Sequence, residues 1–197
     1  MMKKIGIFVL GLVLLGLLLA PSAAFAQISS YNADFQVVNL EDATAQITIT
    51  FYNQDGSSHA SVTDSIAPLG SNTYSPLPGA VQPGFDGSVV IASTTEVASI
   101  SNVKGNESEY GSSYSSFAGG SKEASLPLIN KDNYGINTWF NVQNTGGTPT
   151  TVTVEYTGGC DETRLIQPNA AQTFDQATNT CLPSGYNGAA TVTADGA

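Results

Sequence analysis

Apolar and polar residues alternate along most of this chain, and turn-forming residues interrupt the alternation about every ten positions. The segment 45–52 reads Ala-Gln-Ile-Thr-Ile-Thr-Phe-Tyr, and 150–157 reads Thr-Thr-Val-Thr-Val-Glu-Tyr-Thr. A period of two places every second side chain on the same face of a β-strand. Short strands at this spacing are typical of an all-β sandwich. The pattern therefore predicts an all-β, antiparallel fold with almost no helix.

The same succession of patterns occurs twice. Segment 34–39 returns at 139–144, and 45–52 returns at 150–157, in both cases 105 residues later (139 − 34 and 150 − 45). Two further motifs return after 100 and 101 residues, with Ile66 matching Ile166 and Gly87 matching Gly188. Self-similarity at one period indicates tandem units. We interpret the chain as a first sandwich at 27–104, a Gly/Ser/Tyr-rich connecting loop at 105–122 and a second sandwich at 123–197.

The two units are predicted to share most of their strands. The first has strands at 33–39, 45–52, 60–66, 71–75, 87–93 and 97–103, and the second at 124–129, 137–144, 150–157, 163–166, 172–174 and 188–194. Phe35 should be equivalent to Phe140, and Tyr74 to Phe174.

The second unit has no counterpart of strand 97–103, so it is predicted to lack its last strand. We expect an open edge beside 188–194 and less core burial than in the first unit. The interpretation we favour is a truncated end at Ala197. The alternative is self-association, in which a strand from a neighbouring subunit fills the gap head to tail.

The first 26 residues carry the pattern of a secretory signal peptide. Lys3 and Lys4 precede an apolar run of 16 residues from Ile5 to Ala20 (20 − 5 + 1), and small residues follow at Ala24 and Ala26. This pattern predicts cleavage between Ala26 and Gln27 and export through the general secretory route. A retained N-terminal anchor is the alternative, although the run is shorter than the ~20 residues that a spanning helix needs. The mature chain contains no predicted membrane span.

Charge and cysteine content fit an exported protein. Without Lys3 and Lys4 the chain has four basic residues (6 − 2) and 16 acidic ones, a formal net charge of −12 (4 − 16). Such a surface repels phosphate backbones, so nucleic acid is not an expected partner. Cys160 and Cys181 are the two cysteines, and in an exported chain they predict a disulfide. The expected location is extracellular or at the cell surface.

Candidate catalytic and metal-binding groups are sparse. His59, the single histidine, lies near Ser57 and Asp64, but a predicted polar hairpin offers no buried carboxylate or oxyanion hole for a triad. No catalytic residue and no cofactor is therefore assigned. Calcium is the one metal with any support, because several acidic residues fall in predicted loops. These are Asp55, Asp64, Asp86, Asp132, Asp161 and Glu162.

An aromatic segment interrupts the predicted connecting loop. Tyr110, Tyr114 and Phe117 lie among Gly and Ser residues. A flexible linker would be made of Gly and Ser alone, so we expect this segment, as a loop or small hairpin, to pack on one unit. A plain linker and a ligand loop that stacks on sugar rings are the alternatives.

Several motifs resemble a known class of module. Asn-Thr-Gly at 144–146 is followed by Thr-Val-Thr-Val at 151–154, and Ile-x-Pro at 166–168 precedes Thr-Phe at 173–174. Together with the run 126–144, these motifs resemble bacterial Ig-like repeats of the cell-adhesion-related, CARDB-like type. The resemblance covers nearly all of 31–197 and implies seven-strand sandwiches in a surface protein, with no catalytic or binding residues. Asn169 and Ala170 depart from the Pro-Gly turn that is usual in these repeats.

Taken together, these features predict two tandem Ig-like sandwiches in a non-enzymatic, structural or adhesive protein of the cell surface or extracellular matrix. Its partners would be other surface proteins or polysaccharide. A carbohydrate-binding module that uses the loop 110–117 is the alternative function. A secreted hydrolase is the remote alternative, because 16 carboxylates supply many candidate pairs.

Overall fold

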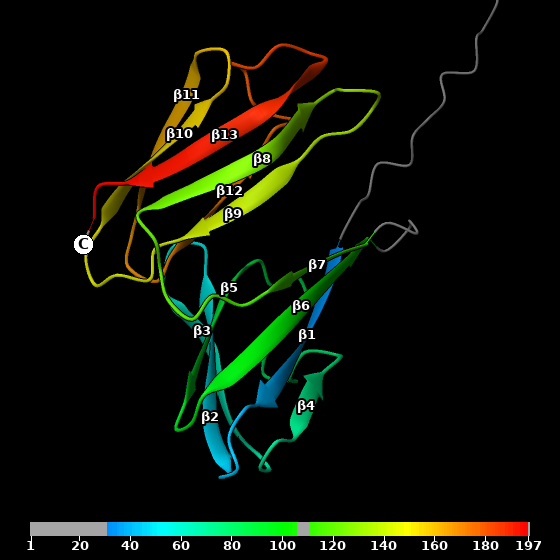
Figure 1. Ribbon diagram of the computed structural model, residues 1–197, viewed down its shortest axis with the longest axis vertical. Helices are drawn as coiled ribbons and strands as arrows, with labels where there is room; N and C mark the ends of the chain where they lie inside the picture. The colour runs from blue at the N-terminus through cyan, green and yellow to red at the C-terminus, as the bar shows by residue number, and fades with distance from the viewer. Residues whose placement is uncertain (1–30, 106–110, 197) are drawn as a thin grey trace, which may run out of the picture.

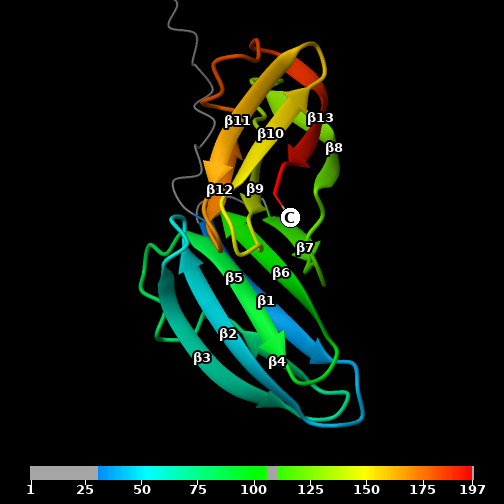
Figure 2. The same ribbon diagram turned by 90° about the vertical axis from the view of Figure 1, so that its left-hand side faces the viewer.

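The chain is all-β, as its alternating pattern predicts. The computed structural model describes residues 31–105 and 111–196, and these contain thirteen strands and no helix. Every strand pair within them is antiparallel. The predicted signal peptide lies outside the described residues. Figure 1 and, from the side, Figure 2 show the strands in two groups, which we call the N-terminal strands (β1–β7) and the C-terminal strands (β8–β13).

The N-terminal strands form two sheets. One sheet has the order β4-β1-β6-β7 and the other the order β3-β2-β5. The strands are β1 (Tyr31–Asn39), β2 (Ala45–Asn53), β3 (Ser58–Ile66), β4 (Ser71–Tyr74), β5 (Gly87–Ser93), β6 (Val97–Gly105) and β7 (Gly111–Ser115).

The C-terminal strands also form two sheets, with the orders β11-β10-β13-β8 and β12-β9. The strands are β8 (Glu123–Lys131), β9 (Trp139–Gln143), β10 (Thr150–Tyr156), β11 (Cys160–Ile166), β12 (Ala171–Asp175) and β13 (Tyr186–Ala194). All strands predicted from the alternation are present, and most differ from the prediction by only a few residues at their ends.

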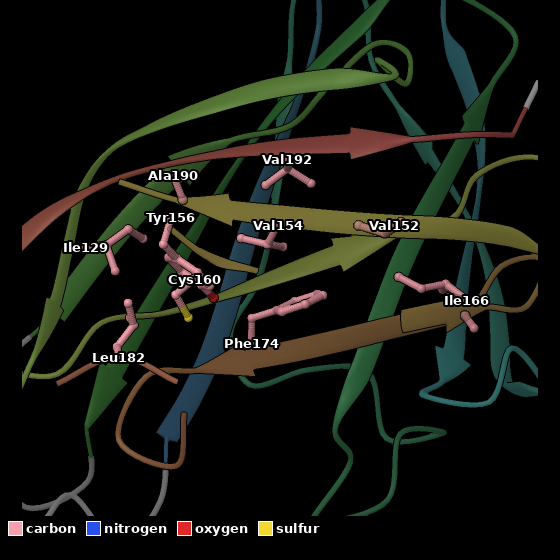
Figure 3. Close-up of a cluster of buried hydrophobic side chains, with 11 residues drawn as sticks. Ile129, Val152, Val154, Tyr156, Cys160, Ile166, Phe174, Leu182, Ala190 and Val192 are labelled. Carbon is pink, nitrogen blue, oxygen red and sulfur yellow. The ribbon is translucent and has the colours of Figure 1, made fainter. Parts of the chain in front are cut away.

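Each group encloses its own apolar core between its two sheets. Side chains at alternate positions point inward, so Ile47 and Ile49 on β2, like Val152 and Val154 on β10, are at most 2% exposed. The N-terminal core consists of Phe35, Val37, Ala45, Ile47, Ile49, Phe51 and Ile66. The C-terminal core, drawn in Figure 3, consists of Ile129, Val152, Val154, Tyr156, Cys160, Ile166, Ala170, Phe174, Leu182, Ala190 and Val192.

An aromatic pair occupies the same kind of position in both groups. Phe35 on β1 lies opposite Tyr74 on β4, with ring centroids 4.8 Å apart. Phe140 on β9 lies opposite Phe174 on β12, with centroids 5.2 Å apart. Both pairs are stacked, because directly opposed residues of an antiparallel pair bring their rings together.

A buried asparagine lies at the end of the first strand of each aromatic pair: Asn39 is the last residue of β1, and Asn144 directly follows β9. The amide of Asn39 donates to the carbonyls of Ala43, Ile66 and Ala67 at 2.6, 3.3 and 3.1 Å. The amide of Asn144 donates to the carbonyls of Thr148 and Ile166 at 2.8 and 3.0 Å. Each of these asparagines therefore joins its own turn to the end of a strand in the opposite sheet, and satisfies backbone groups that would otherwise be buried unpaired.

The predicted open edge beside 188–194 is wrong. That segment belongs to β13, which pairs with β10 on one side and with β8 on the other. On this part of the sandwich, among the described residues, β9 has a free side, because its one partner is β12. Its counterpart in position, β1, has partners on both sides, β4 and β6. β8, the first strand of the C-terminal group, thus pairs along the edge of β13 that was predicted to be open. The edge without a partner is that of β9.

The expected weaker burial in the second unit is also wrong. Its core contains more buried apolar residues than the N-terminal core does. The additional burial comes from β8, which supplies Ile129, and from the segment after β12, which supplies Leu182. Both cover the side of the sandwich near Cys160.

The two groups touch at a few points. The ring of Tyr31 on β1 lies 5.4 Å from that of Trp139 on β9. Ser88 Oγ on β5 donates to the carbonyl of Asn169 at 3.4 Å. Gly56 has φ +87° and sits so close to the carbonyl of Pro168 that a Cβ there would overlap it. Glycine is therefore required at this contact both by its backbone angle and by the available space.

We expect Asn39→Ala to lower the free energy of unfolding by about 2 kcal/mol or more, because it leaves buried carbonyls without a donor. Urea unfolding monitored by tryptophan fluorescence and far-UV circular dichroism measures the change. The control is Asn141→Ala on the exposed face of β9, which should cost about 0.5 kcal/mol or less. Equal effects of the two substitutions would contradict the role given to Asn39.

Candidate functional site

The aromatic segment between the two groups pairs with the first group as a small hairpin, one of the forms expected for it, but its described aromatic side chains are exposed and do not pack on a unit as expected. β7 pairs with β6 to form a hairpin, with Lys104 opposite Gly111. Tyr114 on β7 is 55% exposed and Phe117 is 85% exposed. Tyr110 lies outside the described residues. The hairpin adds one short strand of mainly small, polar residues to the edge of the sheet. Its described aromatic side chains therefore have no apolar surface beside them to cover.

His59 does not form a triad with Ser57 and Asp64. Its Nδ1 lies 3.1 Å from Asn53 Oδ1, and its Nε2 accepts the backbone N–H of Gln82 at 3.2 Å. The imidazole also packs against the ring of Phe85, with centroids 4.7 Å apart. These contacts tie the β2–β3 hairpin to the segment after β4, which is a structural arrangement.

The acidic residues proposed as calcium ligands are dispersed. Within residues 31–105 and 111–196, no group of three or more His, Cys, Asp or Glu side chains is arranged to hold a metal ion. Asp55 accepts from the N–H and hydroxyl of Ser57, and Asp86 accepts from Gln54. Asp132 accepts from Asn137. These carboxylates order turns, which is a frequent role for aspartate in loops.

Asp64 and Tyr74 form a hydrogen-bonded polar pair among the N-terminal strands. The Tyr74 hydroxyl donates to Asp64 Oδ2 at 2.8 Å, and Asn72 Nδ2 donates to the same oxygen at 2.9 Å. The hydrogen bond from Tyr74, followed by those from Ser65 and Asn72, holds the pKa of Asp64 below its usual value. Burial, with the negative charge of Asp64, raises the pKa of Tyr74 to about 12. The pair stabilises the chain while Asp64 is ionised and Tyr74 is protonated.

A second polar cluster lies beside the C-terminal core. Glu162 on β11 accepts from the Tyr156 hydroxyl at 2.6 Å, from Asn179 Nδ2 at 2.9 Å and from Arg164 at 3.3 Å. Gln176 Nε2 donates to the Tyr156 oxygen at 3.0 Å. Burial, and then the hydrogen bond to Glu162, raise the pKa of Tyr156. Each of these groups is satisfied by a neighbour, and a raised pKa keeps the phenol protonated as a donor.

The segment between β12 and β13 is fixed by this cluster and by the disulfide. Cys160 and Cys181 are bonded, as predicted, with Cα atoms 5.8 Å apart. Asn179 Oδ1 accepts the backbone N–H groups of Cys181 and Leu182, both at 2.9 Å. Lys131 Nζ donates to the carbonyls of Asn179 and Leu182. These contacts hold the segment between β12 and β13 against the sandwich, and their role is structural.

An apolar groove lies between β8 and β9, on the open side of the C-terminal sandwich. Its volume is about 280 Å³, and its lining includes Leu126, Leu128, Trp139 and Phe140. Leu128 is 57% exposed and Trp139 is 40% exposed. The position of the groove follows from the free side of β9, because no strand there covers the gap between the two sheets. The open edge was predicted beside 188–194, so the groove between β8 and β9 was not predicted.

The loop between β8 and β9 presents two further exposed apolar residues that the sequence analysis did not single out. Tyr134 is 94% exposed, with φ +52°, and Ile136 is 56% exposed. Asn133 and Ile136 exchange backbone hydrogen bonds across the turn. Gly135 is the signal that could have identified the turn, since it has φ +78° and glycine favours positive φ.

Compared with known protein families, with curated proteins and with solved structures, the chain matches none. In the part of the chain that the structure describes, there is no helix with the length and apolar character of a membrane span.

We expect Tyr74→Phe to lower the free energy of unfolding near neutral pH by about 1 kcal/mol, since the stacked ring remains and one hydrogen bond is lost. The pKa of Asp64 is lowered in the folded chain, so the contribution of the pair is present above the unfolded value of about 4 and is lost as pH falls further. The pKa of Tyr74 is raised, so the contribution is also lost as pH rises from about 10 towards 12.

The difference between wild type and Tyr74→Phe should thus be largest between these limits and should shrink at both ends. Urea unfolding across the pH range measures it. Tyr114→Phe is the control, because Tyr114 is exposed on β7, and it should show no such dependence. A difference that is constant with pH would refute the coupling.

Proposed function

We propose that this chain is a structural or adhesive component of the cell surface or extracellular matrix, built from two tandem Ig-like sandwiches and exported after removal of residues 1–26. The single observation that carries this proposal is the matched internal framework of the two strand groups. Phe35 and Tyr74 on β1 and β4 correspond to Phe140 and Phe174 on β9 and β12. Asn39, the last residue of β1, and Asn144, the residue after β9, both donate to turn and strand-end carbonyls.

The remaining strands support duplication in the same way. β2 pairs with β3 and β5, and β10 pairs with β11 and β13, so each group has the same three-stranded centre. What the groups share is packing and turn geometry, while the polar clusters differ between them. Duplication of a framework without a shared polar site favours a building block over a catalyst.

Three features support export. The N-terminal pattern is that of a signal peptide. The disulfide Cys160–Cys181 is a bond that persists in oxidising compartments. A formal net charge of −12 after cleavage (4 − 16) keeps molecules apart in solution outside the cell.

Expression of the whole chain from Met1 in a secreting bacterium tests the proposal. We expect a mature protein that begins at Gln27, is labelled on intact cells by an amine reagent that does not cross the membrane, and remains with the surface or matrix fraction. Replacing both Ala24 and Ala26 by Leu should block cleavage, because the peptidase requires small residues there. N-terminal sequencing and cell fractionation provide the readout. A chain that stays inside the cell with residues 1–26 attached would refute the proposal.

Carbohydrate binding is a second candidate, and the exposure of Tyr114 and Phe117 favours it. An aromatic ring that lies free on a surface can stack on the apolar face of a sugar ring. Tyr114 lies on β7 at the edge of the sheet, and Phe117 lies shortly after this strand.

If that function is correct, the double variant Tyr114→Ala/Phe117→Ala should lose at least about 90% of its binding to a polysaccharide in a pull-down or glycan array, because stacking contributes ~1–3 kcal/mol per ring on other π-faces. Tyr134→Ala is the matched control, since Tyr134 is also exposed but lies in the β8–β9 loop. Retention of polysaccharide by the double variant at the wild-type level would remove this candidate.

A further inference from the structure

Two strands of the described chain have a free side, an apolar inward face and no charged or proline residue. β9 pairs with β12 alone, and β5 pairs with β2 alone. Val89 faces inward on β5, opposite Phe51, and yet is 37% exposed. Phe140 and Val142 on β9 are likewise packed against the core and only partly buried. The exposure of inward-facing residues marks both edges as open sides of a sandwich.

These edges differ from the other outer strands. β8 has Glu123, Pro127 and Lys131, and β11 has Asp161, Glu162 and Arg164, which are the residues that discourage edge pairing. β4 and β7 are short and made mainly of Ser, Asn, Thr and Gly. In contrast, β5 reads Gly-Ser-Val-Val-Ile-Ala-Ser and β9 reads Trp-Phe-Asn-Val-Gln, with no charge or proline in either.

Each of the two free edges lacks a neighbouring strand that the equivalent strand of the other group possesses. β6 lies beside β1, and the equivalent place beside β9 is empty among the described strands. β8 lies beside β13, and the equivalent place beside β5 is empty in the same sense. A single contact between β9 of one molecule and β5 of another would supply both missing partners.

We propose that β9 of one molecule pairs antiparallel with β5 of a second copy of this chain. This would join two sheets into one of order β3-β2-β5-β9-β12 across the contact. Placing Asn141 opposite Val90 sets Phe140 against Ile91 and Val142 against Val89, so inward-facing apolar residues meet across the strands. The same register places Ser88 opposite Gln143.

The charge distribution favours a second copy at this place. Each mature molecule has a formal net charge of −12 (4 − 16), so two copies repel each other over most orientations. β5, β9 and the residues that line the groove contribute no charge. Because the two edges are different surfaces, the contact is heterologous and repeats head to tail into open chains. Added salt should strengthen the association by screening the repulsion.

The inference rests on the proposed structural role, and cysteine cross-linking of the mature chain tests it. Asn141→Cys and Val90→Cys are made separately, with the Cys160–Cys181 disulfide intact. A short bifunctional maleimide should link molecules in the mixture of both variants, and should link few when either variant is alone. Linkage with Asn141→Cys alone would show a symmetric β9–β9 contact and overturn the proposal, as would linkage with Val90→Cys alone.

Sedimentation of the unmodified chain provides the second measurement. We expect concentration-dependent assembly that increases with salt, and a midpoint shifted at least about tenfold to higher concentration by Asn141→Glu or Val90→Glu. Leu165→Glu is the matched control, because Leu165 is 61% exposed on the edge strand β11, and it should leave the midpoint unchanged.

A chain that is monomeric at all concentrations and salt levels overturns this inference alone, since an exported monomer still satisfies the proposed function. A chain that assembles but is retained inside the cell overturns the proposed function alone.

Discussion

The structure depends on the requirement that each sheet bury one face and pair every strand. Alternate residues of β2 and β10 lie at the centre of their cores, and the sheets opposite them contribute the aromatic pairs Phe35–Tyr74 and Phe140–Phe174. Because a strand's side chains alternate with period two, shifting either sheet by one residue would turn these rings to solvent. In each sandwich, the inward position of its ring pair therefore depends on the register of the strands.

The buried asparagines show how the sheets are joined at their ends. A sandwich leaves carbonyl groups unpaired where the chain crosses from one sheet to the other, and water does not reach those next to the core. Asn39 and Asn144 each donate to such carbonyls from the opposite sheet. An apolar residue of the same size would fill the space and leave the carbonyls unsatisfied, at a cost of about 1–3 kcal/mol each.

Much of the fold could be predicted from the sequence, because strand formation is encoded locally. The alternation in 45–52 and 150–157 identified β2 and β10, and the even cysteine count identified the disulfide, which the structure confirms. The partner of a strand is a property of the whole sandwich, however. Nothing within 123–131 indicates that β8 pairs with β13, so the free side of β9 and its groove could not be placed. The exposure of Phe117 was missed for a related reason, since aromatic content alone does not show whether an apolar surface lies nearby.

The closure between β12 and β13 bears on how long the protein would last in its surroundings. Ten residues, 176–185, connect these strands without regular strand structure. A protease must draw several residues of substrate backbone into an extended form before it can cut, and irregular connections are its usual targets. Here the amide and carbonyl groups of Asn179, the ammonium of Lys131 and the sulfur bridge hold the backbone from several directions. The longest irregular connection of the C-terminal strands is thereby made a poor protease substrate, and this would give a chain in a protease-rich medium a longer lifetime.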